Sequence, residues 1–85
     1  MKHYLIFCKD DQQWNEYVET HEYILKDSLC NSLEVRDNSM ILHKKCGFES
    51  ESVYIKVTPQ TVDSYIPSCL LFKEQIWLCD KEEFV

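Results

Sequence analysis

The strongest constraint on the fold is an amphipathic pattern between residues 11 and 26. Apolar or aromatic side chains recur there three or four residues apart, which is the spacing of one helix face. They are Trp14, Tyr17, Val18, His21, Ile24 and Leu25. The opposite face carries Glu16, Glu19, Glu22 and Lys26. Asp10 followed by Gln13 fits a capping box. The pattern predicts a helix over about residues 11–26 with one buried face.

Short runs with strand character surround this helix. The run HYLIFC is continuously apolar, which indicates a buried strand, and VYIKVT alternates, which indicates a strand with one solvated face. Asp37 and Asn38 tolerate positive φ and predict a hairpin turn between two further runs. Gly47 predicts a bend in the polar connection that follows. The predicted strands are 3–8, 32–35, 39–44 and 53–58.

The C-terminal third is less regular. Thr58 and Pro59 predict a short helical turn through Tyr65. Residues 68–79 fit either two strands, SCLLF and IWLC, or one helix with Cys69, Phe72, Ile76 and Cys79 on one stripe; strands are favoured. The order is then strand, helix, three strands, and a C-terminal strand or hairpin. Residues 1–85 are expected to form a single compact α+β domain, with one amphipathic helix packed on an antiparallel sheet.

The net charge of the chain limits the classes of partner that it is expected to bind. The chain has 15 acidic and 9 basic residues, a formal net charge of −6, and Arg36 as its single arginine. Direct nucleic-acid binding and docking on an anionic membrane both need clustered lysine and arginine, so both are disfavoured. Electrostatic pairing with a basic protein surface is favoured instead. We expect homodimerisation only as an alternative.

The cysteines are expected to be reduced. There is no apolar run long enough for a secretory signal or for a membrane span, so a cytoplasmic location is predicted. Reduced cysteines behave as small buried hydrophobes. The five are Cys8, Cys30, Cys46, Cys69 and Cys79.

One motif suggests chemistry. His43 and Cys46 have the spacing of two metal ligands, but no second close pair completes a zinc site, and strand alternation places them on opposite faces. We therefore expect His43 on the solvated face and Cys46 in the core, and predict no metal, cofactor or catalytic residue. A small metal-dependent or thiol enzyme that uses His43, Cys46 and a further cysteine remains the alternative.

The distribution of acidic and aromatic residues suggests a binding surface. The hypothesis is a small intracellular protein that inhibits or neutralises a partner, such as a nuclease, by occluding a basic surface. In size and acidity it is like phage anti-defence inhibitors and toxin-immunity proteins, with no shared motif. A self-associating structural subunit is a further alternative, and an ordinary solvated surface would also explain the acids. The aromatic anchors considered are Trp14, Tyr23, Tyr54 and Trp77. The predicted partner-binding residues are Glu16, Glu19, Glu22, Tyr23, Glu49, Glu51, Asp80, Glu82 and Glu83.

Overall fold

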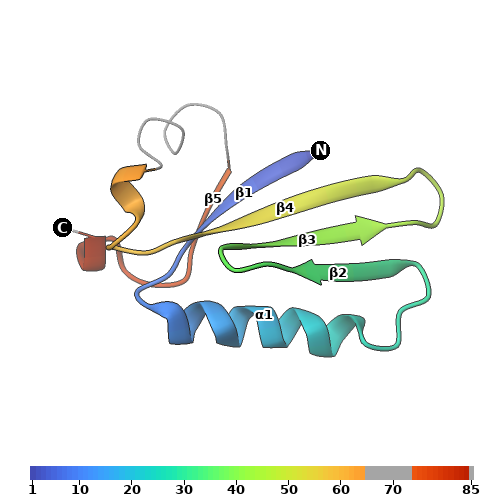
Figure 1. Cartoon of the computed structure of the whole chain (residues 1–85), viewed down its shortest axis with the longest axis horizontal. Helices are drawn as coiled ribbons and strands as arrows, with labels where there is room; N and C mark the ends of the chain where they lie inside the picture. Colours follow the sequence, from blue (N-terminus) through green and yellow to red (C-terminus); the bar gives the residue numbers. More distant parts are fainter. Residues whose placement is uncertain (65–73, 85) are drawn as a thin grey trace.

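The computed structural model describes residues 1–64 and 74–84, and it places one helix against a five-stranded sheet (Figure 1). The strand order across the sheet is β2-β3-β4-β1-β5. The α+β class predicted from the sequence is confirmed. The elements are β1 (Lys2–Phe7), α1 (Asp11–Leu25), β2 (Asn31–Val35), β3 (Ser39–Lys44), β4 (Ser50–Val57), the 3-10 turn η1 (Val62–Ser64), β5 (Glu74–Trp77) and the 3-10 turn η2 (Lys81–Phe84).

Strand β1 lies inside the sheet and makes the sheet mixed. It pairs in parallel with β4, where Tyr4 lies opposite Tyr54, and in parallel with β5, where Ile6 lies opposite Ile76. The expectation of a wholly antiparallel sheet is therefore wrong; only β2–β3 and β3–β4 are antiparallel. A strand buried on both faces reads as an unbroken apolar run, and this is the character of residues 3–8. That run indicated burial but carried no information on strand direction.

Helix α1 begins as its capping pattern predicts. Asp10 is extended at the N-cap, and its side-chain Oδ1 accepts a hydrogen bond from the Gln13 amide at 2.9 Å. The Gln13 side chain in turn accepts from the Lys9 amide at 2.8 Å and donates to the Leu78 carbonyl at 2.8 Å. An ion pair of 3.0 Å joins Asp11 to Lys56 Nζ on β4. The start of the helix is thus fixed to both the sheet and the C-terminal segment.

The predicted β2–β3 hairpin is confirmed, with a turn of a different type. Val35 pairs with Met40, and the Arg36 amide donates to the Ser39 carbonyl at 2.8 Å across Asp37 and Asn38. Neither Asp37 nor Asn38 adopts a positive φ. The two residues therefore form the turn without the left-handed backbone that suggested them.

The connection from β3 to β4 bends at Gly47, as expected. Gly47 has φ +79°, a conformation that side chains with a Cβ rarely adopt, and an added Cβ would meet no atom within 4 Å. Its role is therefore in the backbone. Strand β4 begins at Ser50, earlier than the predicted residue 53, because Ser50 and Glu51 continue the ladder opposite Lys44 and His43.

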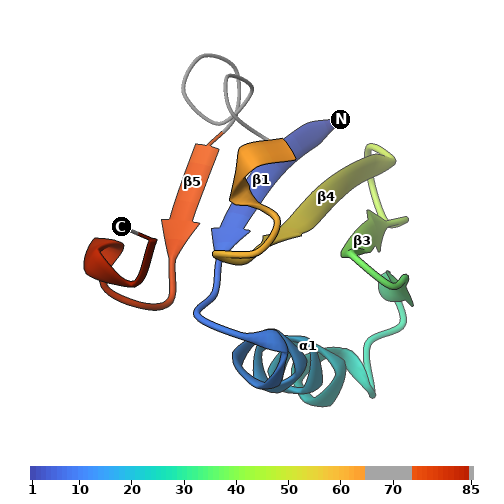
Figure 2. The same cartoon turned by 60° about the vertical axis from the view of Figure 1, so that its left-hand side comes forward.

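Apolar side chains pack on both faces of the sheet. In Figure 2, α1 covers one face, and the core there consists of Ile6, Cys8, Trp14, Val18 and Met40. On the opposite face the buried residues are Leu5, Phe7 and Val57, and side chains from η1, β5 and η2 pack against them: Val62, Trp77 and Phe84. The alternation in β4 predicted that one face of the sheet is solvated. The face opposite α1 is solvated only at the β2–β3 end of the sheet, because side chains from η1, β5 and η2 cover the rest of the core there.

The described C-terminal third contains one strand, β5, and the 3-10 turns η1 and η2. The turn after β4 is held by Thr58, whose carbonyl accepts from the amides of Thr61 and Val62 at 3.0 and 2.9 Å. Residues 74–77 form β5, so the helical alternative is wrong there, while the predicted strand SCLLF lies outside the described residues. The Leu78 amide donates to the Phe7 carbonyl at 3.0 Å and extends the β1–β5 pairing.

Cys30 and Cys46 form a disulfide, which corrects the prediction of reduced, buried cysteines. They lie just before β2 and just after β3, with 5.0 Å between their Cα atoms, and Cys46 is exposed rather than in the core. The Lys45 amide donates to the Cys30 carbonyl at 2.7 Å beside the disulfide. Hairpin pairing brings the two cysteines together, and their spacing in the sequence did not indicate it.

Removal of this disulfide is expected to destabilise the protein without changing its fold. The cysteines are 16 residues apart, and cross-links that close loops of that size stabilise proteins by about 2–4 kcal/mol. The double variant Cys30→Ser/Cys46→Ser should lose that much free energy of unfolding in urea, and wild type with reductant should match it. Cys79→Ser, which removes a free thiol, is the control. An unfolding midpoint that reductant leaves unchanged would contradict the stabilising role.

Candidate functional site

The outer face of α1 carries three glutamates of the predicted site. Glu16, Glu19 and Glu22 are all exposed, and Glu19 and Glu22 also line a hollow between the helix and the β2–β3 turn. Gln12 donates a 3.4 Å hydrogen bond to Glu16, and in the described part of the chain none of the three forms an ion pair. We call these three residues the acidic stripe. Lys26, the basic residue of this face, places its Nζ 4.6 Å from the centre of the Tyr23 ring.

The acidic residues of the C-terminal segment lie near the start of the same helix. Asp80 precedes η2, and Glu82 and Glu83 are exposed within it. Burial raises the pKa of the nearby Cys79 thiol, and Glu83, Asp80 and Asp10 raise it further. The C-terminal segment and the N-terminal end of α1 therefore form one acidic region of the molecule.

Glu49 and Glu51 lie elsewhere. They belong to the β3–β4 connection and the start of β4, at the end of the molecule opposite η2 (Figure 1). Glu51 is opposite His43 in the ladder, so it is on the sheet face turned away from α1. The nine predicted partner-binding residues therefore do not form one continuous surface.

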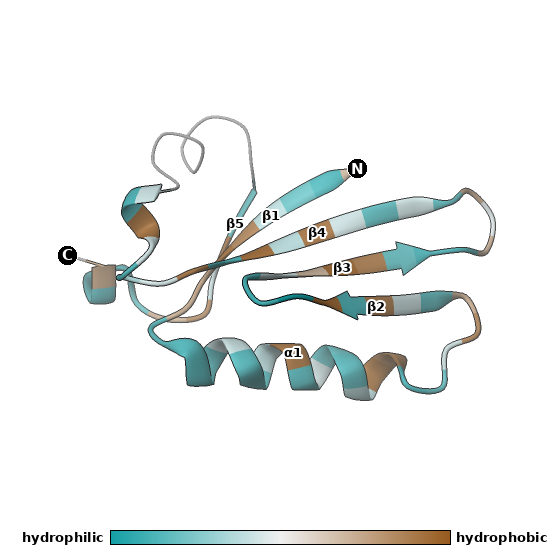
Figure 3. Cartoon of the chain, in the orientation of Figure 1, coloured by the Kyte–Doolittle hydropathy of each residue, from teal (hydrophilic) through white to brown (hydrophobic). Residues whose placement is uncertain are grey.

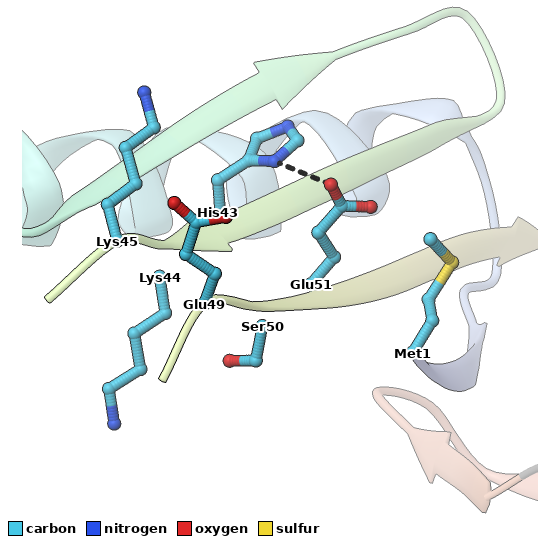
Figure 4. A pocket seen from close by; sticks show the side chains of 7 residues that line it. All are labelled: Met1, His43, Lys44, Lys45, Glu49, Ser50 and Glu51. Atoms are coloured by element: carbon cyan, nitrogen blue, oxygen red, sulfur yellow. Dashed lines mark ion pairs between the residues drawn. The ribbon is translucent and has the colours of Figure 1, made fainter. Parts of the chain in front are cut away.

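His43 lies between two carboxylates on the open face of the sheet. Its Nδ1 is 3.4 Å from Glu51 Oε1 on β4, and its Nε2 is 3.6 Å from Glu34 Oε1 on β2. Figure 4 shows Glu51 pointing toward the imidazole, while Lys44 and Lys45 extend in opposite directions. A hollow of about 420 Å³ adjoins the pair. Glu34 was missed by the sequence reasoning, although the hairpin register places it on the same face as His43.

This cluster is better suited to joining strands than to holding a metal ion. The two imidazole nitrogens face two different carboxylates, so three donor atoms do not converge on one point. No group of three metal-ligating side chains occurs among the residues described. A protonated imidazole would donate to both carboxylates and link β2, β3 and β4.

The thiols do not have the character of nucleophiles. Burial raises the pKa of Cys8 to about 12, and nearby Cys79 raises it as well. Cys46 is in the disulfide, so a His43–Cys46 site would have no free thiol. A reactive cysteine needs a lowered pKa, and neither free cysteine among the described residues has one. Cys69 lies outside the described residues.

Three of the four aromatic anchors considered are engaged within the protein. Trp14 is buried in the core, Tyr54 stacks on Tyr4 at 5.0 Å between ring centres, and Trp77 stacks on Phe7 at 4.0 Å. Tyr23 is the one that is free to contact a partner, with 70% of its surface exposed. The sequence pattern could not separate core aromatics from exposed ones outside the helix.

An apolar end of the molecule was also missed. Leu29 and Phe48 are 98% and 96% exposed, and they lie on the two loops that the disulfide joins. Ile24, at the C-terminal end of α1, is exposed as well, contrary to its predicted place on the buried face. Figure 3 shows hydrophobic colour at the end of α1 and in both loops. We call Tyr23, Ile24, Leu29 and Phe48 the apolar tip.

Comparison with known families, curated proteins and solved structures finds no match to this chain. Among the described helices, none has the length and apolar character needed to span a bilayer. The choice of function therefore depends on the chemistry of the surfaces. These are the acidic stripe, the His43 cluster and the apolar tip.

Proposed function

We propose that this chain is a small acidic binding protein that inhibits or neutralises a partner protein by occluding a basic surface. The observation that carries the proposal is the acidic stripe. Its carboxylates have no ion-pair partner in the described chain, and they lie on a helix that the core and the capping hydrogen bonds fix in place. Because the helix backbone is already ordered, binding requires no backbone ordering there, and the unpaired charges steer a basic partner toward it.

The partner is a protein with a basic cleft or face, such as a nuclease or another enzyme that acts on nucleic acid. Asp80, Glu82 and Glu83 extend the acidic surface beyond the first turn of α1. The proposed location is the cytoplasm, where the Cys30–Cys46 disulfide would be open to reduction.

The test is affinity capture from cells of the native host, followed by measurement of the captured protein's Kd at low and high salt. We expect a basic protein whose binding weakens as salt screens the charges. Charge reversal of the acidic stripe then assigns the surface. Capture that withstands both high salt and this reversal would contradict the proposal.

Self-association is the second candidate, and the apolar tip favours it. Exposed apolar residues gathered at one end are typical of a surface that is buried in an assembly. Light scattering should then give a dimer mass that high salt does not reduce, and the variant Leu29→Ser/Phe48→Ser should be monomeric. The control is Val35→Ser, which replaces an exposed apolar residue outside the tip and should leave the dimer intact. A wild-type monomer at all concentrations would exclude this candidate.

A further inference from the structure

A groove of about 400 Å³ runs between α1 and the turn that joins β2 to β3. Its apolar lining comes from Trp14, Val18 and Val35. Carboxylates stand on both sides of it, Glu19 and Glu22 on the helix and Asp37 on the turn. Two residues of the acidic stripe therefore border a groove with both polar and apolar lining, whereas Glu16 lies outside it.

The groove has negative charge that the described chain does not neutralise. Glu19, Glu22 and Asp37 form no ion pair with a described residue. Arg36 also lines the groove, but both its Nε and its Nη2 are directed to Glu34. Arg36 is therefore paired with Glu34 and forms no ion pair with Glu19, Glu22 or Asp37.

We infer that this groove binds an arginine side chain of the partner, an inference that rests on the proposed function. An arginine combines an apolar stem, which can lie along Val18 and Val35, with a planar guanidinium, which can donate to carboxylates on two sides. The ammonium of lysine is a compact and strongly hydrated point charge whose three donors rotate, so it lacks the planar, fixed donor geometry of a guanidinium. The groove thus discriminates between basic partners, whereas the acidic stripe alone would attract any of them.

The inference can be tested on the free protein, before any partner is identified. ¹⁵N-labelled protein is titrated with Nα-acetyl-arginine amide, with the matched citrulline derivative, which is uncharged, and with the lysine derivative. We expect saturable shifts with arginine at the amides of Val18, Glu19, Val35 and Asp37. We expect no saturable shift with citrulline, and weaker binding with lysine. Equal shifts with citrulline, or shifts spread over all exposed acids, would overturn the inference.

Two double variants test whether arginine affinity depends on the carboxylates that line the groove. Glu19→Gln/Glu22→Gln should weaken arginine binding about threefold or more, because it removes two of the three carboxylates that line the groove. Asp63→Asn/Glu74→Gln removes the same charge at two exposed acids outside the groove and the acidic stripe, and should leave the affinity unchanged. Equal weakening by both would show that only net charge matters and would refute the groove.

If capped arginine does not bind while stripe reversal still abolishes partner capture, the inference fails and the proposed function stands. If arginine binds but no captured partner depends on the stripe, the proposed function fails instead.

Discussion

Replacement of Trp14 by alanine is expected to lower the free energy of unfolding by about 3–5 kcal/mol, the range for a buried Trp or Phe. Trp14 is only 3% exposed and lies in the core between α1 and the sheet, with Ile6 and Met40. Its loss leaves a cavity at the interface that holds the helix. Since domains of this size have a total stability of about 5–15 kcal/mol, the change is a large part of the whole.

The control is Ile24→Ala on the same helix. Ile24 belongs to the same apolar pattern in the sequence but is 67% exposed, so its replacement should change stability by about 0.5 kcal/mol or less. Chemical denaturation followed by far-UV circular dichroism measures both. Val18→Ala, with a smaller cavity, keeps the comparison measurable if Trp14→Ala does not fold, and should cost about 1–2 kcal/mol. Equal costs at Ile24 and Val18 would contradict the position of the helix.

Charge reversal of the acidic stripe, Glu16→Lys/Glu19→Lys/Glu22→Lys, is expected to weaken partner binding about 100-fold or more at low salt, because placing like charges against a basic surface costs several kcal/mol. The three side chains are exposed, so the fold should persist. The loss should shrink as salt is added, since the charges are then screened.

The matched control is Asp27→Lys/Asp63→Lys/Glu74→Lys, in which three exposed acids outside the predicted surface are reversed. Each substitution adds two positive charges, so both triples bring the formal net charge from −6 to zero. The control should therefore lose the general attraction of an acidic protein but keep most of the affinity. Isothermal titration with the captured partner compares the two. If the control weakens binding as much as the stripe does, the position of the charges is irrelevant and the proposed surface is wrong.

The predictable parts of the fold are those that depend on residues close together in the sequence. The helix follows from apolar spacing and from the Asp10–Gln13 cap, and the cap hydrogen bonds form as predicted. The β2–β3 hairpin follows from two short strand-like runs around Asp37 and Asn38. Gly47 lies at the bend that the sequence predicted after the third strand-like run, and it has a positive φ there.

What could not be predicted depends on residues distant in the sequence. The parallel pairing of β1 with β4 and β5 joins segments about 50 and 70 residues apart, and no local pattern encodes strand direction. The Cys30–Cys46 disulfide and the Glu34–His43–Glu51 cluster both arise from the register of paired strands. The same holds for the proposed groove, because Val35 and Asp37 come from the hairpin and Glu19 and Glu22 from the helix.

The candidate surface was predictable only in part. The helix spacing correctly places Glu16, Glu19 and Glu22 on one exposed face. Grouping them with Glu49 and Glu51 required a tertiary arrangement that the chain does not adopt. The exposure of Leu29 and Phe48 could not be predicted either, because the sequence of a loop does not show whether its apolar residues are buried.

The most direct test of the account is to map the captured partner onto ¹⁵N-labelled protein by its amide signals. We predict that the changes concentrate on the outer face of α1, from Asn15 to Glu22, and on Arg36 and Asp37 across the groove. The apolar tip around Leu29 and Phe48 should be unaffected. Changes confined to the tip, with the helix amides unmoved, would contradict the proposal that the acidic face of α1 is the binding surface.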